Sequence, residues 1–328
     1  MISRRRVLVA FGFGALAEIL PVSAQQKIKH IGFLYFGSRE SAISTGRYRA
    51  FLQGMREQGY VEGKDFVIEG RFAEGRGERL PGQAAELVQL GVDVIVATGN
   101  PAIEAARHAT STLPIVTAIS ADPVGAGRAT SLARPGGNIT GLYISSDELV
   151  PKHMELMATV VPRLSRVAVL SNPVNPVHAG RVKTAQAILE KTGAYVSALQ
   201  ASTPADIDRA FSAMARDRAE ALLVLGDSFF TQQVRQIAEL ALKYRLPSIY
   251  ATHDYVDAGG LMSYAEDVTD NFRLAARYVD KIFKGAKPAE LPFERSTRIY
   301  LMINRKTAKA IGLAIPRELL LRADKVIE

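Results

Sequence analysis

The chain has 328 residues, no cysteine and a net charge of +8, from 41 Lys and Arg against 33 Asp and Glu. Without cysteine, the chain can form no disulfide, thiol nucleophile or cysteine-linked lipid anchor, so its packed core must carry stability. The basic residues are spread along helical segments and are not interleaved with aromatic residues, so nucleic acid is not expected as a partner.

Residues 1–24 have the order of a secretory signal: three arginines at 4–6, an apolar run over 7–20 and small residues at 22–24. The apolar run is too short to cross a bilayer comfortably. Ser3-Arg4-Arg5 also resembles the start of a twin-arginine signal, but Val7 and Val9 depart from its usual pattern, so the export route stays open. Removal of this segment would leave 304 residues with a charge of +6, enough for two domains.

From residue 27 onward, short β-branched runs alternate with helical patterns, which is typical of α/β proteins with parallel sheets. The first half predicts strands over 30–36, 66–72, 92–97, 114–119 and 139–144, and helices over 45–58, 80–90, 101–110 and 124–133. The second half predicts strands over 166–170, 195–199, 221–225, 247–251, 261–264 and 298–303, and helices over 150–160, 179–192, 204–216, 231–244 and 271–283. A linker over 288–292 and a C-terminal helical tail broken at Pro316 complete the pattern. Two sets of βα units, divided near 145–149, predict two doubly wound lobes with parallel sheets.

Polar residues follow the strands, at the edge where doubly wound sheets bind ligands. Asn100 is expected to cap a helix whose free N–H groups could hold a carboxylate. Ser120 and Asp122 follow the next strand, and Asn172 and Asp227 follow two strands of the second half. Each residue taken singly could be an ordinary helix cap. Gathered in one cleft, they would offer donors for a carboxylate and carboxylates for an amine, which predicts a zwitterionic ligand.

Aromatic residues at strand ends could form an apolar wall of the same cleft. Tyr35 and Tyr250 are the two that we expect to pack on the ligand's side chain, and packing in the core is the alternative for each.

No catalytic or cofactor-binding arrangement is found in the sequence. The five histidines are scattered without a metal-binding spacing, and neither a G-x-S-x-G elbow nor a phosphate-binding loop is present. A G-x-G-x-x-A match at 12–17 falls inside the predicted signal, away from any strand and helix. We therefore expect a protein that is not an enzyme and has no cofactor or metal.

An ordered series of motifs along the whole chain resembles the ABC-transporter substrate-binding family of the tryptophan/tyrosine-binding type. The motifs run over residues 59–64, 73–76, 80–81, 84–88, 92–96, 110–116, 122–125, 131–142, 172–176, 258–264, 278–282 and 303–308. The match is specific to the family and much less specific to a ligand.

The resemblance implies a type I periplasmic-binding fold, with two lobes joined by hinge crossovers. Residues 25–145 with about 268–290 would form the first lobe, and residues 146–267 with about 291–328 the second. The hinge crossings would follow the glycine-rich segment 134–141, lie near 266–270, and fall around 288–292.

The same resemblance implies a soluble, monomeric periplasmic carrier that closes on a small molecule and delivers it to an inner-membrane ABC permease. Characterised relatives bind aromatic amino acids. Asn100 and Ser120 would hold the carboxylate, Asp227 and Asp122 would pair with an amine, and Asn172 would bind from the second lobe. A sensor that presents its ligand to a membrane receptor is the first alternative, and an exported α/β enzyme is the second.

Overall fold

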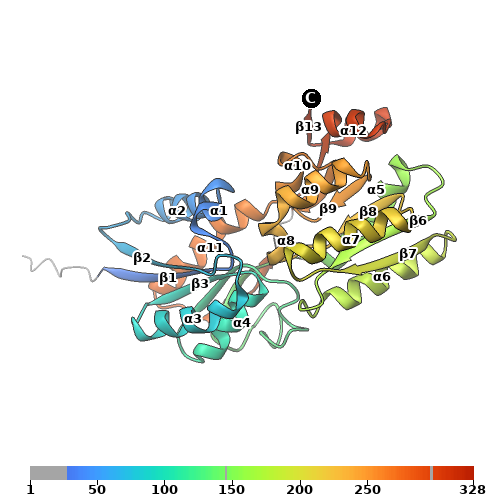
Figure 1. Ribbon diagram of the computed structural model, residues 1–328. Coiled ribbons are helices and arrows are strands. Elements are labelled where there is room, and N and C mark those ends of the chain that lie inside the picture. Colours follow the sequence, from blue (N-terminus) through green and yellow to red (C-terminus); the bar gives the residue numbers. More distant parts are fainter. Residues whose placement is uncertain (1–27, 145, 296–297) are drawn as a thin grey trace, which may run out of the picture.

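The computed structural model describes residues 28–144, 146–295 and 298–328, so the predicted signal 1–24 lies outside the described residues. The described chain forms two α/β lobes, each built on its own sheet (Figure 1). The expected fold class, two doubly wound parallel-sheet lobes, is confirmed.

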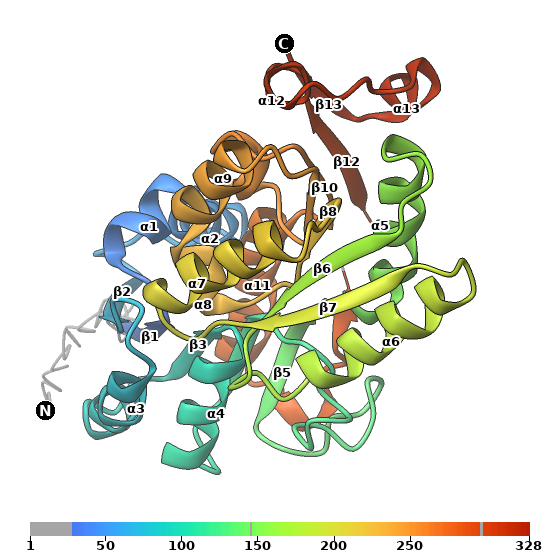
Figure 2. The ribbon, with the colours of Figure 1, turned by 45° about the vertical axis from the view of Figure 1, so that its right-hand side comes forward.

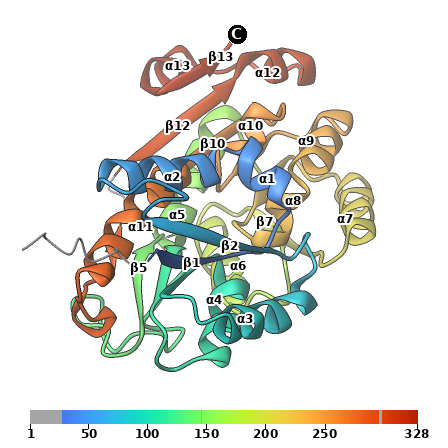
Figure 3. The same cartoon turned by 90° about the vertical axis from the view of Figure 1, so that its left-hand side faces the viewer.

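The first lobe contains a six-stranded parallel sheet in the order β11-β5-β4-β3-β1-β2. Its strands are β1 (Lys29–Tyr35), β2 (Phe66–Phe72), β3 (Val94–Thr98), β4 (Ile115–Ile119), β5 (Ile139–Tyr143) and β11 (Glu294–Arg295). Two helices cover each face, α3 (Leu80–Gln89) and α4 (Asn100–Ala109) on one and α2 (Arg47–Glu57) and α11 (Val268–Phe283) on the other (Figure 3). Every residue of β3 is buried, as expected of a strand covered on both faces.

The second lobe contains a seven-stranded sheet in the order β13-β12-β10-β9-β8-β6-β7. Its strands are β6 (Arg166–Ser171), β7 (Tyr195–Gln200), β8 (Ala221–Val224), β9 (Ser248–Tyr250), β10 (Met262–Glu266), β12 (Ile299–Asn304) and β13 (Lys325–Ile327). All neighbours are parallel except β10 and β12. Helices α5 (Ser146–Val160) and α6 (His178–Glu190) cover one face, and α7 (Pro204–Arg216) and α9 (Val234–Lys243) the other.

The C-terminal residues extend the second lobe at the outer edge of its sheet (Figure 2). Helices α12 (Arg305–Ile311) and α13 (Arg317–Arg322) flank β13 there, and Pro316 separates them as the sequence predicts. None of the helices in the described part of the chain is long and apolar enough to cross a membrane.

The chain changes lobes three times. It leaves the first sheet after β5, returns after β10, where Asp267 caps α11, and leaves again after β11. The sequence places this last change around 288–292, but β11 pairs with β5 through Glu294 and Arg295. The chain is therefore still in the first sheet at Arg295.

The largest local difference from the predicted elements is the segment 124–133, which forms turns instead of a helix. Gly127 takes a left-handed φ of 67°, and the N–H groups of Arg128 and Ala129 both donate to the carbonyl of Pro123. These bonds close a turn, so the side chain of Arg128 is directed into the protein and buried.

Several short elements that the sequence pattern did not predict lie near the cleft. They are α1 (Arg39–Ser44), η1 (Gly77–Arg79), α8 (Ser228–Gln232) and α10 (Asp254–Asp257). A further short turn of helix, η2 (Pro288–Glu290), occupies the predicted linker. These segments are too short for helical periodicity to be detected.

Candidate ligand-binding site

Two adjoining cavities lie between the lobes, beyond the carboxyl ends of both sets of strands. The first cavity, of about 90 Å³, is lined by residues that include Tyr35, Arg47 and Asn100 from the first lobe and Arg181, Asp227 and Thr252 from the second. The second cavity, of about 470 Å³, shares Asn100 and Asp227 with the first, and its size lies in the range of small-molecule sites. Both cavities are candidates for one continuous ligand site.

The lobes approach each other closely at two glycines, which explains why the first cavity is narrow. A Cβ on Gly99 would lie 2.6 Å from the Oγ of Ser228, and a Cβ on Gly37 would lie 2.5 Å from the side-chain amide of Gln232. Gly99 also has a φ of 80°, which favours glycine. Side chains at these two positions would hold the lobes apart.

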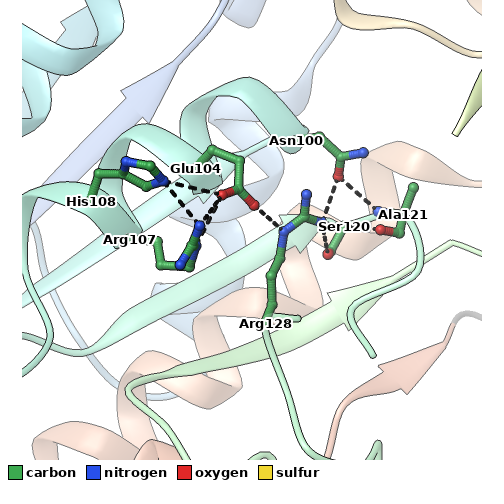
Figure 4. Close-up of polar contacts among 7 residues, drawn as sticks. All are labelled: Asn100, Glu104, Arg107, His108, Ser120, Ala121 and Arg128. Atoms are coloured by element: carbon green, nitrogen blue, oxygen red, sulfur yellow. Dashed lines mark hydrogen bonds and ion pairs between the residues drawn. The ribbon is translucent and has the colours of Figure 1, made fainter. Parts of the chain in front are cut away.

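Asn100 lies on the wall of the first lobe and lines both cavities. It is the first residue of α4, and Gly99 takes the N-cap position, so the expected capping role of Asn100 is wrong. Its Oδ1 accepts hydrogen bonds from the N–H of Ala121 at 3.1 Å and from Nη1 of Arg128 at 2.9 Å (Figure 4). Its Nδ2 has no hydrogen-bond partner in the described part of the chain, so it can donate to a ligand.

Ser120 and Asp122 do not line either cavity. Ser120 is fully buried, and its Oγ accepts a hydrogen bond from Arg128 at 3.1 Å. Asp122 is exposed with a φ of 43°, and its Oδ1 accepts the N–H of Gly125 at 2.8 Å. Ser120 therefore lies behind the wall, and Asp122 takes part in a surface turn, so the structure brings neither to the cleft.

Asp227 lies on the opposite wall and lines both cavities, as the N-cap of α8. Its Oδ1 accepts the N–H of Phe229 at 2.9 Å and Nδ2 of Asn172 at 3.0 Å, and its Oδ2 accepts Nδ2 of Asn175 at 2.8 Å. The structure thus brings Asn172 and Asp227 together, and Asn172 lines the second cavity. Because Oδ2 has a single partner among the described residues, it can accept a further donor.

His178 supports this wall from behind. Its Nδ1 accepts the N–H of Asn172 at 2.8 Å, and its Nε2 donates to the carbonyl of Gly226 at 3.1 Å. This pattern requires the neutral ring with the proton on Nε2. Burial lowers the pKa of His178, so the ring stays neutral at neutral pH.

The two tyrosines predicted to contact the ligand have different positions. Tyr35 lines the first cavity, and its hydroxyl accepts a hydrogen bond from Nη1 of Arg47 at 3.0 Å. Tyr250 is fully buried and stacks on Tyr255 with ring centroids 4.3 Å apart, so it is a core residue and does not line either cavity. Burial raises the pKa of Tyr250, in agreement with its position in the core.

Sequence reasoning missed several polar residues of the first cavity, among them Arg47, Arg181 and Asn175. Arg47 joins the lobes, because its Nη2 lies 2.6 Å from Oδ2 of Asp254 and its side chain is only 5% exposed. Arg181 is also buried. A signal for both arginines exists in the sequence, since each shares the buried stripe of its helix with apolar residues. Arg47 precedes Phe51 and Met55 at helical spacing, and Arg181 precedes Ala185 and Leu189.

The described residues hold no group of three or more His, Cys, Asp or Glu side chains placed to bind a metal ion. The polar groups of the two cavities are instead amides, hydroxyls, three arginines (Arg47, Arg128 and Arg181) and three carboxylates (Glu78, Glu104 and Asp227). Groups of this kind bind small polar molecules through hydrogen bonds and ion pairs.

Two doubly wound lobes with a polar cleft at their facing strand ends define a two-lobed binding protein of the periplasmic type I architecture. The chain belongs to the family of ABC transporter substrate-binding proteins, whose model matches residues 40–327. The family expected from the sequence is therefore confirmed.

Similar proteins agree with this family. A tyrosine-binding protein of Clostridioides difficile (strain R20291) is 24% identical over 267 residues, which are 81% of this chain and 76% of that protein. A solved structure of a conserved domain protein from Vibrio cholerae is 27% identical, with a TM-score of 0.85 over 92% of this chain and 100% of that chain. An ABC domain from Streptococcus pneumoniae, solved in complex with L-Trp, is 26% identical, with a TM-score of 0.83 over the same shares of the two chains.

Proposed function

We propose that this protein is the substrate-binding component of an ABC importer and captures an α-amino acid, or a closely related carboxylated molecule, between its lobes. The observation that carries the proposal is the opposite hydrogen-bonding character of Asn100 and Asp227, which line the same two cavities from opposite lobes. Nδ2 of Asn100 can donate to a carboxylate, and Oδ2 of Asp227 can accept from an ammonium group.

Apolar and aromatic residues of the cavities suit the side chain of such a ligand. Tyr35, Phe36 and Ile119 line the first cavity from the first lobe, and Phe36 and Phe229 line the second. The relatives named above, a tyrosine-binding protein and a domain solved with L-Trp, support an aromatic amino acid as the first ligand to test.

Closure of the lobes about the crossovers is part of the proposal. The ion pair of Arg47 with Asp254 and the approach of Ser228 to Gly99 both join the two lobes. A ligand that contacts both walls stabilises the closed form, because only that form offers both sets of contacts.

We further propose that residues 1–24 direct export to the periplasm, where the mature protein acts as a soluble monomer and delivers its ligand to an inner-membrane permease. The charged, apolar and small-residue order of this segment supports export. The protein would bind and release its ligand unchanged, as expected of a family of substrate-binding proteins.

Titration calorimetry of the purified protein with L-tryptophan, L-tyrosine and a panel of other amino acids tests this function. One ligand should bind, raise the thermal midpoint by several degrees and be recovered intact. Asp227→Asn should weaken binding at least tenfold, because asparagine lacks the negative charge that would pair with the ammonium group. Asparagine can still cap α8, so the helix should be kept. Asp208→Asn removes a charge from an exposed residue of the same lobe and should leave the affinity unchanged. Absence of binding across the panel, or consumption of a tested molecule, would contradict the proposal.

A further inference from the structure

Arg128 places a largely buried cation in the first-lobe wall of the cleft, where it lines the second cavity together with Asn100 and Glu104. Its side chain is 2% exposed, and its Nε donates to Oε1 of Glu104 at 2.7 Å. Its Nη1 donates to three oxygens: Oδ1 of Asn100 at 2.9 Å, Oγ of Ser120 at 3.1 Å and the carbonyl of Ala121 at 3.0 Å (Figure 4). One side chain therefore ties α4 to the end of β4.

The contacts of Asn100 determine how its amide is turned. The two groups that reach Oδ1, the N–H of Ala121 and the guanidinium of Arg128, can only donate hydrogen bonds. An amide turned by 180° would place Nδ2 against two donors. Oδ1 must therefore face Arg128, and Nδ2 faces away from it, with no hydrogen-bond partner in the part of the chain that the structure describes (Figure 4).

Glu104 holds the guanidinium in this position. It lies one helical turn after Asn100 on α4, so the same helix carries two of the partners of Arg128. Burial raises the pKa of Glu104, but hydrogen bonds from Arg128 and Arg107 outweigh this effect and hold the pKa below its ordinary value. The carboxylate is therefore charged at neutral pH. A buried cation with a charged, hydrogen-bonded partner keeps one geometry, because leaving that partner would expose an uncompensated charge.

We propose that Arg128 is a positioning residue that fixes the amide of Asn100 with its nitrogen toward the ligand, and so selects a ligand with a carboxylate at this position. The inference rests on the proposed function, because it takes the cleft to bind an amino acid. Arg128 acts through Asn100.

The selection follows from the donor that Asn100 presents. A carboxylate accepts from Nδ2 in a charge-assisted hydrogen bond, which is roughly twice as strong as the neutral bond that a carboxamide can accept. If the amide of Asn100 could turn freely, its oxygen would at times face the ligand, repel a carboxylate and accept from a carboxamide. The measurable quantity is therefore the ratio of the affinities for an amino acid and for its amide.

Calorimetry with L-tryptophan and L-tryptophanamide measures this ratio. The wild-type protein should bind the acid about tenfold to a hundredfold more tightly than the amide. Asn100→Asp places a carboxylate oxygen where Nδ2 stood, while its other oxygen still accepts from Arg128 and Ala121. This variant should reverse the preference in favour of the amide. Arg128→Met should lower the wild-type ratio at least fivefold.

Two further variants separate positioning from a merely structural role. In an Asn100→Ala background, Arg128→Met should leave the ratio unchanged, because Arg128 acts through the residue that is already absent. Arg107→Met removes another partner of Glu104 without touching Asn100, so the affinity ratio of this variant should equal that of the wild type. Circular dichroism and thermal unfolding establish that each variant is folded.

If Arg128→Met does not fold, Arg128→Lys and Asn100→Asp carry the test. Lysine keeps a cation beside Glu104 but lacks the planar fork that reaches Asn100 at the same time, so its ratio should also fall. Unchanged ratios in the Arg128 variants or in Asn100→Asp would overturn the inference, as would an equal effect of Arg128→Met with and without Asn100. Wild-type protein that binds neither molecule nor any other amino acid of the panel would overturn the proposed function as well. Wild-type protein that binds an amino acid and its amide, with variants that leave the ratio of the two affinities unchanged, would overturn this inference alone.

Discussion

The first-lobe wall and the second-lobe wall of the cleft both contain side-chain amides, and these amides are hydrogen-bonded to groups of opposite charge. In the first lobe, Arg128 donates to the oxygen of Asn100, and Nδ2 of Asn100 has no partner among the described residues. In the second lobe, Asn172 and Asn175 donate to Asp227 and leave an acceptor. Under the proposed function, this polarity across the cleft would give a zwitterion one favoured orientation.

The lobes also differ in their titratable groups. The described histidines of the first lobe, His30 and His108, have side chains that are 43% and 69% exposed. His153 and His178 of the second lobe are buried, and burial lowers the pKa of both. Sensitivity to mild acid should therefore be concentrated in the second lobe.

The largest expected effect on stability is that of His178→Ala, a change in the wall of the second lobe. This change leaves the N–H of Asn172 and the carbonyl of Gly226 without their partner, so the free energy of unfolding should fall by about 4 kcal/mol. Urea denaturation measures the loss, with His108→Ala as an exposed control expected to change stability by less than about 0.5 kcal/mol. A loss below about 1 kcal/mol at His178 would show that the wall does not depend on this ring.

Acid should destabilise the protein through His153, whose pKa is lowered from 6.5 to about 4 by burial. Between these pH values the unfolded chain binds the proton and the folded chain does not, so stability falls as the pH falls. The loss from this residue is about 3 kcal/mol by pH 4. Arg181 also lowers the pKa, and the hydrogen bond to the carbonyl of Tyr264 opposes the shift.

The measurement compares the wild type with His153→Gln, which can still donate to that carbonyl, by urea denaturation at pH 7 and pH 4. The wild type should lose about 3 kcal/mol more than the variant. Hydrogen exchange should show amides of the second lobe losing protection first. Equal losses in both proteins would refute the assignment to His153.

Arg47→Met tests the contact between the two lobes. The ion pair with Asp254 joins α2 to α10 across the cleft, so its loss should weaken binding of L-tryptophan by about tenfold, or about 1.4 kcal/mol. Arg49→Met, on an exposed position of the same helix, is the matched control and should leave the affinity unchanged. Equal affinities of the two variants would mean that the pair does not contribute to closure.

The smallest effect on stability is expected at Arg107, which forms an ion pair with Glu104, as Arg128 does. Its side chain is 41% exposed, against 2% for Arg128, so solvent screens its ion pair. Arg107→Met should lower the free energy of unfolding by less than about 0.5 kcal/mol, whereas Arg128→Met should lower it by about 3 kcal/mol. Urea denaturation of both variants checks this contrast, and similar losses would contradict it.

The strands and long helices could be predicted from the sequence because each carries a clear apolar pattern. The segment 124–133 could not, since its turns depend on Gly127 and on the burial of Arg128, which only the folded neighbours provide. Its alternation of small and apolar residues imitates a helix.

The candidate site was predicted in part. The rule that ligands lie beyond strand ends identifies Tyr35, Asn100, Asn172 and Asp227, which line the cavities. It fails for Ser120, Asp122 and Tyr250, because a strand end fixes where the backbone lies and not the direction of the side chain.

The two arginines of the first cavity were not predicted for a different reason. Arg47 and Arg181 lie on helices, at the ends that approach the cleft, so a search of the loops after strands passes over them. A charged residue on the buried stripe of a helix is the pattern that would have found both.

The late position of α11 has a consequence for synthesis and folding. This helix covers one face of the first sheet through Phe272 and Ala275, yet it is made only after all the strands from β6 to β10 of the second sheet. The first lobe therefore cannot complete its packing until residue 283 has been made, and until then one apolar face of its sheet lacks the cover of α11. Completion of the first lobe is coupled to production of most of the second.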